Sequence, residues 1–173
     1  DKLLGNLHHI PLCVVSGQPD PTRMLLALDA SEGSKRAASF AVSLAGNKAR
    51  ETTLLHVVGA LGFPRDIPES KDLLEAAQRT VEEQARFVMT PIFDEVMRRL
   101  VKEAGLPEKG VASKVSGGAI SRAWAIIEEA RSLDAGTIIL GRRGLSKVEA
   151  YLIGRVGAKV VRLAKNQAVW VVN

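Results

Sequence analysis

Three glycines in the last third of the chain have the spacing of a loop that wraps around a negatively charged group. Gly141, Gly144 and Gly154 lie within the stretch GRRGLSKVEAYLIGRVGAKVV, residues 141–161. Glycine lets the backbone adopt positive φ angles and approach a ligand closely, so consecutive amides can point inward at an anion. Because Gly154 precedes a helical pattern, it would place free N–H groups and the positive end of that helix beside a phosphate. The alternative is that these glycines only form turns.

A carboxylate far away in the sequence could contribute to the same site. Asp29 ends the short aliphatic run MLLALD, and Val57 lies near the end of a second run, TTLLHVV. Asp29 could accept hydrogen bonds from ribose hydroxyls, or it could cap the following helix together with Ser31. Val57 could form an apolar wall for a base or belong to the core. His56 is interpreted as a packed strand residue rather than a ligand or a base.

The elements that must position these residues alternate between strand and helix. Aliphatic runs predict strands at residues 24–29, 52–58, 111–115, 135–140 and 168–172. Helical spacing predicts helices at residues 34–46, 69–104, 120–133 and 152–164. Thr90 and Pro91 are expected to kink or restart the long helix, and Gly117 with Gly118 is expected to turn the chain after the third strand.

This alternation predicts an α/β fold, with a five-stranded parallel, doubly wound sheet and flanking helices. In such a sheet, ligands gather at the carboxyl ends of the strands near the topological switch point. Asp29 follows the first predicted strand and the glycine loop follows the fourth. The sequence therefore predicts that these two features meet in one crevice.

The composition fits one globular domain with an aliphatic core. The chain has 173 residues, of which 46% are hydrophobic but only 4% aromatic, and its net charge is +5. Its last segment is strongly basic, with one acid, Glu149, against Arg142, Arg143, Lys147, Arg155, Lys159, Arg162 and Lys165. This segment could attract a polyanion or could be a solvated helix face. The lack of interleaved aromatic residues disfavours nucleic acid as the partner.

Cysteine usage and hydropathy bear on localisation. Cys13 is the single cysteine, so the chain has no internal disulfide framework, which fits a reducing compartment. Cys13 lies in the apolar run IPLCVV and is expected to be a buried structural thiol. No apolar run is long enough to span a bilayer, and the start has no signal-peptide core. We therefore expect a soluble cytoplasmic protein without a membrane partner.

The first residues do not fit the alternating pattern. Residues 1–16 contain HHIPLCVV, which is comparable with KNQAVWVV near the end of the chain, and KLLGN likewise echoes YLIGR. We expect residues 1–16 to be the tail strand of a preceding, similar domain. Residues 17–22, rich in proline and polar side chains, are expected to be a linker, and residues 23–173 the main domain.

Three motifs in this domain resemble those of the universal stress protein family. They are ALDASEGSKRA at residues 27–37, LLHVV at residues 54–58, and GRRG followed by nine residues before the next glycine. The resemblance implies the same parallel sheet, of the Rossmann-like, adenine nucleotide alpha hydrolase-like kind. It also implies ATP, with or without magnesium, as the cofactor. The binding positions that it implies are Ala27, Asp29, Val57, Gly141, Arg142, Gly144, Gly154, Arg155 and Val156.

One position departs from the family's nucleotide-binding pattern. In that pattern the last glycine is followed by serine or threonine, whereas Arg155 stands here. A guanidinium can bind phosphate through its forked donors, but it could instead fill the phosphate pocket or form a salt bridge elsewhere. Because the backbone donors survive the substitution, retained adenine-nucleotide binding is predicted.

The sequence therefore favours a stress-response module that binds ATP and regulates through dimer or partner association. The alternatives are a nucleotide-free dimerising scaffold and a weak ATPase. For the scaffold, strand 168–172 is expected to be an exposed edge that pairs with a second copy or with the IPLCVV strand of a neighbouring domain. No catalytic or metal-binding constellation is predicted, because His8, His9 and His56 lack partners at suitable spacing.

Overall fold

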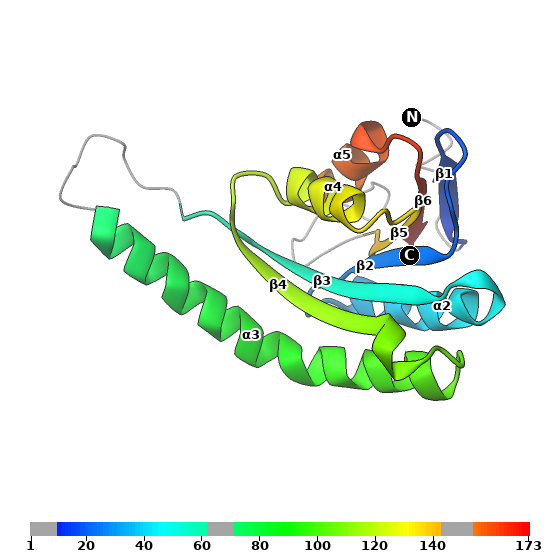
Figure 1. Ribbon diagram of the computed structural model, residues 1–173. Coiled ribbons are helices and arrows are strands. Elements are labelled where there is room, and N and C mark those ends of the chain that lie inside the picture. The colour runs from blue at the N-terminus through cyan, green and yellow to red at the C-terminus, as the bar shows by residue number, and fades with distance from the viewer. Residues whose placement is uncertain (1–9, 62–70, 143–153) are drawn as a thin grey trace.

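The computed structural model describes residues 10–61, 71–142 and 154–173. Its centre is one sheet with strand order β1-β6-β5-β2-β3-β4 (Figure 1). The strands are β1 (Leu12–Val15), β2 (Arg23–Ala27), β3 (Glu51–Gly59), β4 (Val111–Ala119), β5 (Thr137–Gly141) and β6 (Ala168–Val172). The strands β2 to β6 are mutually parallel, and β1 is antiparallel to β6. The predicted parallel sheet is confirmed, with one antiparallel strand added.

Helices cover both faces of this sheet. They are α2 (Glu32–Lys48), α3 (Lys71–Lys102), α4 (Arg122–Ser132) and α5 (Arg155–Leu163), with a short 3₁₀ turn, η2 (Glu108–Gly110), before β4. In Figure 1, α2 and α3 lie below the sheet and α4 and α5 lie above it. Each pair of helices packs on its own apolar cluster. The chain is therefore a three-layer α/β structure.

The central strands are aliphatic throughout because both of their faces are covered. In β2, Leu25 packs toward α4 and α5, whereas Leu26 packs toward α2 and α3, and neither side chain is exposed. Ile138 and Ile139 of β5 divide in the same way. A parallel strand buried on two faces needs such a continuous apolar run rather than an alternating one.

The neighbouring strands β2 and β5 form the topological switch point. The chain leaves β2 into α2 on one face of the sheet and leaves β5 into α5 on the other. The pairing of Ala27 with Leu140 sets the ends of the two strands level. Whatever follows these strands must therefore meet at the carboxyl edge of the sheet.

Two sequence predictions about the middle of the chain are wrong. Helix α3 runs unbroken past Pro91, and Thr90 lies inside it, with its hydroxyl donating to the Arg86 carbonyl at 2.8 Å instead of capping a new helix. Strand β4 continues through Gly117 and Gly118 to Ala119. Gly118 adopts a positive φ of 68°, and the β3–β4 register shifts beside it, so the glycines accommodate an irregularity within the strand rather than end it.

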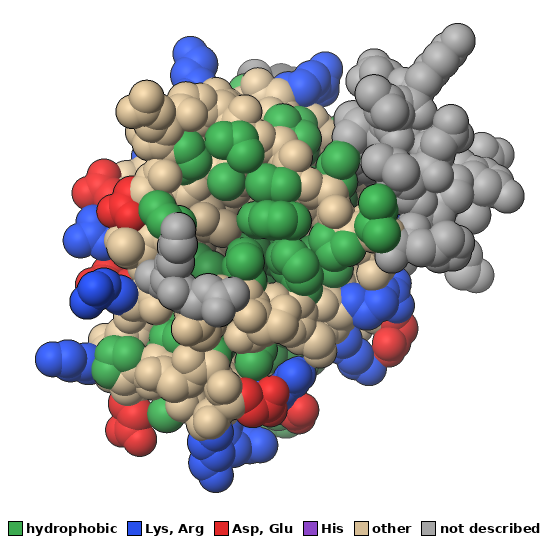
Figure 2. Space-filling view, turned by 90° about the vertical axis from the view of Figure 1, so that its right-hand side faces the viewer, with side chains coloured by type: hydrophobic (Ala, Val, Ile, Leu, Met, Phe, Trp, Pro, Cys, Tyr) green, Lys and Arg blue, Asp and Glu red, His purple; other side chains and the backbone are tan. Residues whose placement is uncertain are grey.

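The last four residues of the segment IPLCVV, Leu12–Val15, form the outer strand at the β6 end of the sheet. Leu12 pairs with Val171 and Cys13 with Trp170, so β6 is an inner strand rather than the exposed edge that the sequence suggested. Figure 2 looks at this end of the molecule and shows a broad apolar area with charged side chains around its margin. Ile10, which lies before β1, and Val15, its last residue, are exposed apolar residues. No helix in the described ranges is both long and apolar enough to cross a membrane.

Candidate functional site at the carboxyl edge of β2 and β5

Asp29 closes the turn between β2 and α2. Its Oδ1 atom accepts hydrogen bonds from the Ser34 hydroxyl at 2.7 Å and from the Ser31 backbone N–H at 3.0 Å, and its own N–H donates to Ser34 Oγ at 2.9 Å. Ser31 is the N-cap of α2 and accepts from the Ser34 N–H at 3.2 Å. Asp29 therefore stabilises the beginning of α2 through Oδ1, as the capping interpretation predicts. Its other carboxylate oxygen, Oδ2, is left for a ligand.

Gly141 lies directly against the beginning of α2. A Cβ atom at this position would come within 2.7 Å of the Gly33 carbonyl carbon and 3.0 Å of the Ser34 nitrogen. Its φ is not among the positive ones, so the prediction of a left-handed conformation at Gly141 is wrong. Close backbone approach requires glycine here, and this approach brings the end of β5 to the Asp29 turn.

The backbone of Arg142 joins both ends of the glycine loop. Its N–H donates to the Val172 carbonyl at 2.5 Å, and its carbonyl accepts from the Gly154 N–H at 2.8 Å. Arg142 is a buried residue, 5% exposed. The first and last glycines of the motif are thereby held close together, while Gly144 lies outside the described residues.

The N-terminus of α5 differs from those of α2 and α4. Ser31 and Ser121 cap the latter two with their hydroxyls, but Gly154 caps α5 and provides no side-chain hydrogen bond. The Gly154 carbonyl accepts from the Ala158 N–H at 3.0 Å, which closes the first turn. The backbone N–H groups that precede Ala158 in this first turn therefore have no side-chain cap, and they carry the partial positive charge of the helix N-terminus.

Arg155 occupies the first position of α5 and is exposed. None of the ion pairs that the structure describes includes it. An exposed guanidinium does not fill a hollow, so the plugged-pocket alternative has no support in the described part of the chain. Its charge adds to the positive end of the helix.

The remaining predicted positions lie around this edge. Ala27 ends β2 between Leu55 and Leu140 of the flanking strands. Val57 is 7% exposed and belongs to the apolar cluster under α4 and α5, where Val156 also packs. A ring nitrogen of His56 hydrogen-bonds the Leu28 carbonyl at 2.7 Å.

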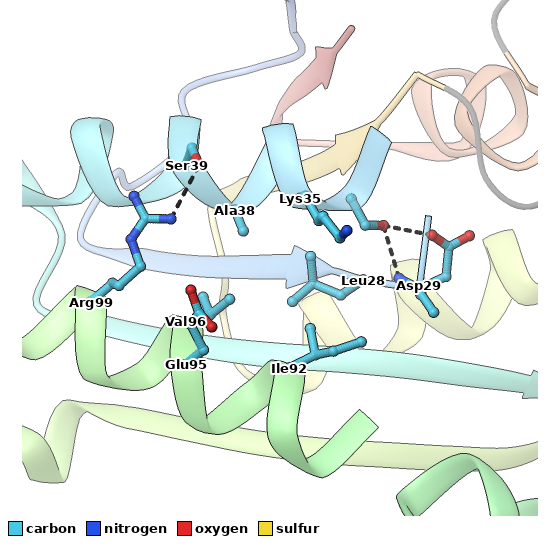
Figure 3. A pocket seen from close by; sticks show the side chains of 11 residues that line it. Leu28, Asp29, Lys35, Ala38, Ser39, Ile92, Glu95, Val96 and Arg99 are labelled. Atoms are coloured by element: carbon cyan, nitrogen blue, oxygen red, sulfur yellow. Dashed lines mark hydrogen bonds between the residues drawn. The ribbon is translucent and has the colours of Figure 1, made fainter. Parts of the chain in front are cut away.

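A pocket next to Asp29, on the α2 and α3 side of the sheet, was not foreseen from the sequence. It lies between α2 and α3, has a volume of about 350 Å³, and is drawn in Figure 3. Apolar side chains of Leu28, Ala38, Ile92 and Val96 line it, and Asp29, Lys35, Glu95 and Arg99 are among its polar residues. Arg99 donates to Ser39 at 3.2 Å across its end. Only the packing of α3 on α2 creates this pocket, so no local motif could have signalled it.

Comparison with known proteins identifies the family of this chain. A sequence model described as the universal stress protein family matches residues 21–173. The chain belongs to the universal stress protein family. A search of curated protein sequences gives no match.

Solved universal stress proteins share this fold. UspA from Lactobacillus plantarum has a TM-score of 0.69 at 21% identity, with 90% of this chain and 100% of that chain covered. A universal stress protein in complex with cAMP has a TM-score of 0.59 at 23% identity, with 88% and 97% covered. For one from Archaeoglobus fulgidus DSM 4304, the TM-score is 0.55 at 21% identity, and 88% of this chain matches 50% of that one.

Proposed function

We propose that this universal stress protein domain binds an adenine nucleotide, ATP, at the carboxyl edge of β2 and β5, and that occupancy changes its association with partners. The observation that carries the proposal is a continuous series of contacts from Asp29 through Ser34 to Gly141, and from Arg142 to Gly154. This series joins two sequence-distant motifs at the switch point, where open α/β sheets bind ligands. The relative in complex with cAMP supports a nucleotide as the ligand.

Each end of the site suits a different part of the nucleotide. The uncapped first turn of α5 and the exposed Arg155 suit the phosphates, and the amide of Gly144 is proposed to complete their cradle. Asp29 Oδ2 would accept from the ribose hydroxyls. Val57 and Val156 would supply an apolar wall on the base side, with the backbones of Ala27 and Arg142 beside it. Magnesium, if bound, would be carried mainly by the phosphates.

Isothermal titration with ATP and magnesium tests the proposal. Wild-type protein at about 100 µM should release measurable heat, and Arg155→Glu should weaken binding by at least about tenfold, because it places a negative charge beside the phosphates. Arg162→Glu is the matched control, since Arg162 is exposed on the same helix but nearly two turns further on. Absence of heat from the wild-type protein, or equal losses in both variants, would contradict the proposed site.

The association part of the proposal rests on the β6 edge. That edge accepts an antiparallel strand, Leu12–Val15, followed by the proposed linker of residues 17–22. We infer that residues 1–16 are the tail strand of a preceding similar domain and that the protein acts in the cytoplasm. The Archaeoglobus relative, half of which this chain matches, is compatible with paired domains. Sedimentation with and without ATP should show a change in oligomeric state, and an unchanged monomer would leave regulation by association without support.

A further inference from the structure

The outward face of α5 carries a line of positive charge. Arg155, Lys159 and Arg162, here called the cationic ridge, are all exposed and are spaced four and three residues apart, which places them on one side of the helix. At 1.5 Å per residue, the ridge is about 10 Å long. The opposite side of α5 is apolar, with Gly157 and Val160 buried against the sheet. The ridge therefore faces solvent because packing fixes the rotation of the helix.

No described carboxylate neutralises the ridge. Helix α5 contains no acidic residue, and none of the described ion pairs includes a ridge residue. By contrast, two cations near the adjacent α4 are paired, Arg131 with Glu128 at 2.8 Å and Lys114 with Glu129 at 2.7 Å. The ridge is thus a local positive field, of the kind that attracts a negatively charged partner.

Exposed apolar side chains lie next to the ridge. Lys159 Nζ donates to Ser121 Oγ at 3.0 Å, and the same oxygen accepts from the Trp124 N–H at 3.4 Å. Ile120, which precedes Ser121, is 98% exposed, and Trp124 is 47% exposed. The Arg131 guanidinium lies 5.5 Å from the Trp124 ring centroid. In Figure 1, α4 and α5 lie side by side above the sheet, so the cations and the apolar residues form one surface.

We propose that this surface binds an acidic protein segment that also carries apolar side chains. Carboxylates of the segment pair with the ridge, and its apolar residues cover Ile120 and Trp124. A nucleic acid would need several aromatic side chains for base stacking, whereas Trp124 is the single aromatic residue that α4 and α5 contain. Arg155 belongs both to the ridge and to the proposed nucleotide site, whereas Lys159, Arg162 and Trp124 lie outside that site. Variants at these three residues therefore test the surface independently of nucleotide binding.

Fluorescence anisotropy with a short labelled peptide of repeating glutamate and leucine tests this surface. The full chain should bind the peptide, and added salt should weaken binding by screening the ridge. The double variant Lys159→Glu and Arg162→Glu should lose at least about tenfold in affinity, because attraction becomes repulsion. Lys159→Gln with Arg162→Gln, which only removes the charges, should lose several-fold and provides a second measurement if the reversed variant folds poorly.

Two controls separate this proposal from a general charge effect. Arg86→Glu with Arg98→Glu makes the same change in net charge at exposed positions of α3 and should keep the affinity within about twofold. Trp124→Ala should weaken binding of the leucine peptide but not of a peptide of repeating glutamate and glycine. The proposal is overturned if the α3 variant loses as much affinity as the ridge variant, if the leucine peptide does not bind, or if oligothymidylate binds more tightly than the peptide.

Discussion

Asp29 illustrates how a single carboxylate can serve the fold and a ligand at the same time. Its Oδ1 atom accepts from Ser31 and Ser34 and so holds the turn that begins α2. Oδ2 is the oxygen left for the ribose in the proposed site. The two roles use different atoms, so substitution can separate them.

We therefore expect Asp29→Asn and Asp29→Ala to differ. Asparagine keeps one acceptor oxygen for the turn but places an amide N–H₂ where the ribose needs an acceptor. Asp29→Asn should keep nearly wild-type stability and lose ATP affinity. Asp29→Ala should also lose about 1 kcal/mol of unfolding free energy, because the turn loses its acceptor. Urea unfolding and titration calorimetry measure the two effects, and loss of stability alone in both variants would argue for a purely structural Asp29.

At the scale of elements, the site depends on how closely β5 approaches the beginning of α2. The approach is possible because Gly33 and Gly141 meet without side chains between them. The same contact brings Gly141, at the carboxyl end of β5, to the Asp29 turn. A bulkier residue would have to push a strand away from a helix, and both are anchored in the core.

Gly141→Ala should therefore destabilise the protein by about 1–3 kcal/mol, because its methyl group would collide with backbone atoms that cannot rotate away. Gly46→Ala is the matched control. Gly46 lies within α2, and an added Cβ would be 3.5 Å from the Ala104 carbonyl oxygen, an ordinary contact. This control should be more stable than wild type by about 0.5–1 kcal/mol. Equal and small effects in thermal or urea unfolding would show that the β5–α2 contact is not tight.

At the scale of the whole molecule, the β1–β6 pairing decides how the domain can associate. As long as β1 occupies the edge of β6, a second copy cannot add its strand there. The strand is short, and three of its four residues are half-buried, so it is weakly held compared with the central strands. Trp170, opposite Cys13, is anchored by its contact with Phe40, with ring centroids 5.0 Å apart.

The single natural cysteine allows this pairing to be locked. Trp170→Cys places a second thiol opposite Cys13, at the Cα separation of about 4.5–5.5 Å that antiparallel partners have, which suits a disulfide. Burial raises the pKa of the Cys13 thiol, so a chemical oxidant is needed at neutral pH. We expect an intrachain crosslink on non-reducing gels. If association requires β1 to leave the edge of β6, the crosslinked protein should be a monomer in sedimentation, and any dimer should return when the disulfide is reduced.

Val171→Cys provides the matched control for the disulfide between Cys13 and Trp170→Cys. Val171 pairs with Leu12, and its side chain points to the opposite face of the sheet from Cys13. It should not crosslink with Cys13. Equal crosslinking of both variants would mean that the register of β1 slips, and crosslinks between chains alone would mean that β1 pairs with another copy.

The sequence by itself determined the parallel sheet, the approach of Gly141 to the Asp29 turn, and the family. These features rest on local patterns, namely aliphatic runs, helical spacing and glycine positions, which act over a few residues. The local sequence pattern did not predict that α3 continues unbroken past Pro91. The packing of Met89 and Phe93 in the core overrides the local cost of proline in the helix.

Only the tertiary structure decided what depends on residues far apart in the chain. The need for glycine at Gly141 comes from Gly33 on another element, and the pocket beside Asp29 comes from α3 lying on α2. The cationic ridge becomes a surface only because the apolar side of α5 is buried. Trp124 becomes its neighbour because α4 packs beside α5, where Lys159 and the Trp124 N–H share the Ser121 hydroxyl oxygen. Such contacts join segments whose separation along the chain leaves no periodic or local signal.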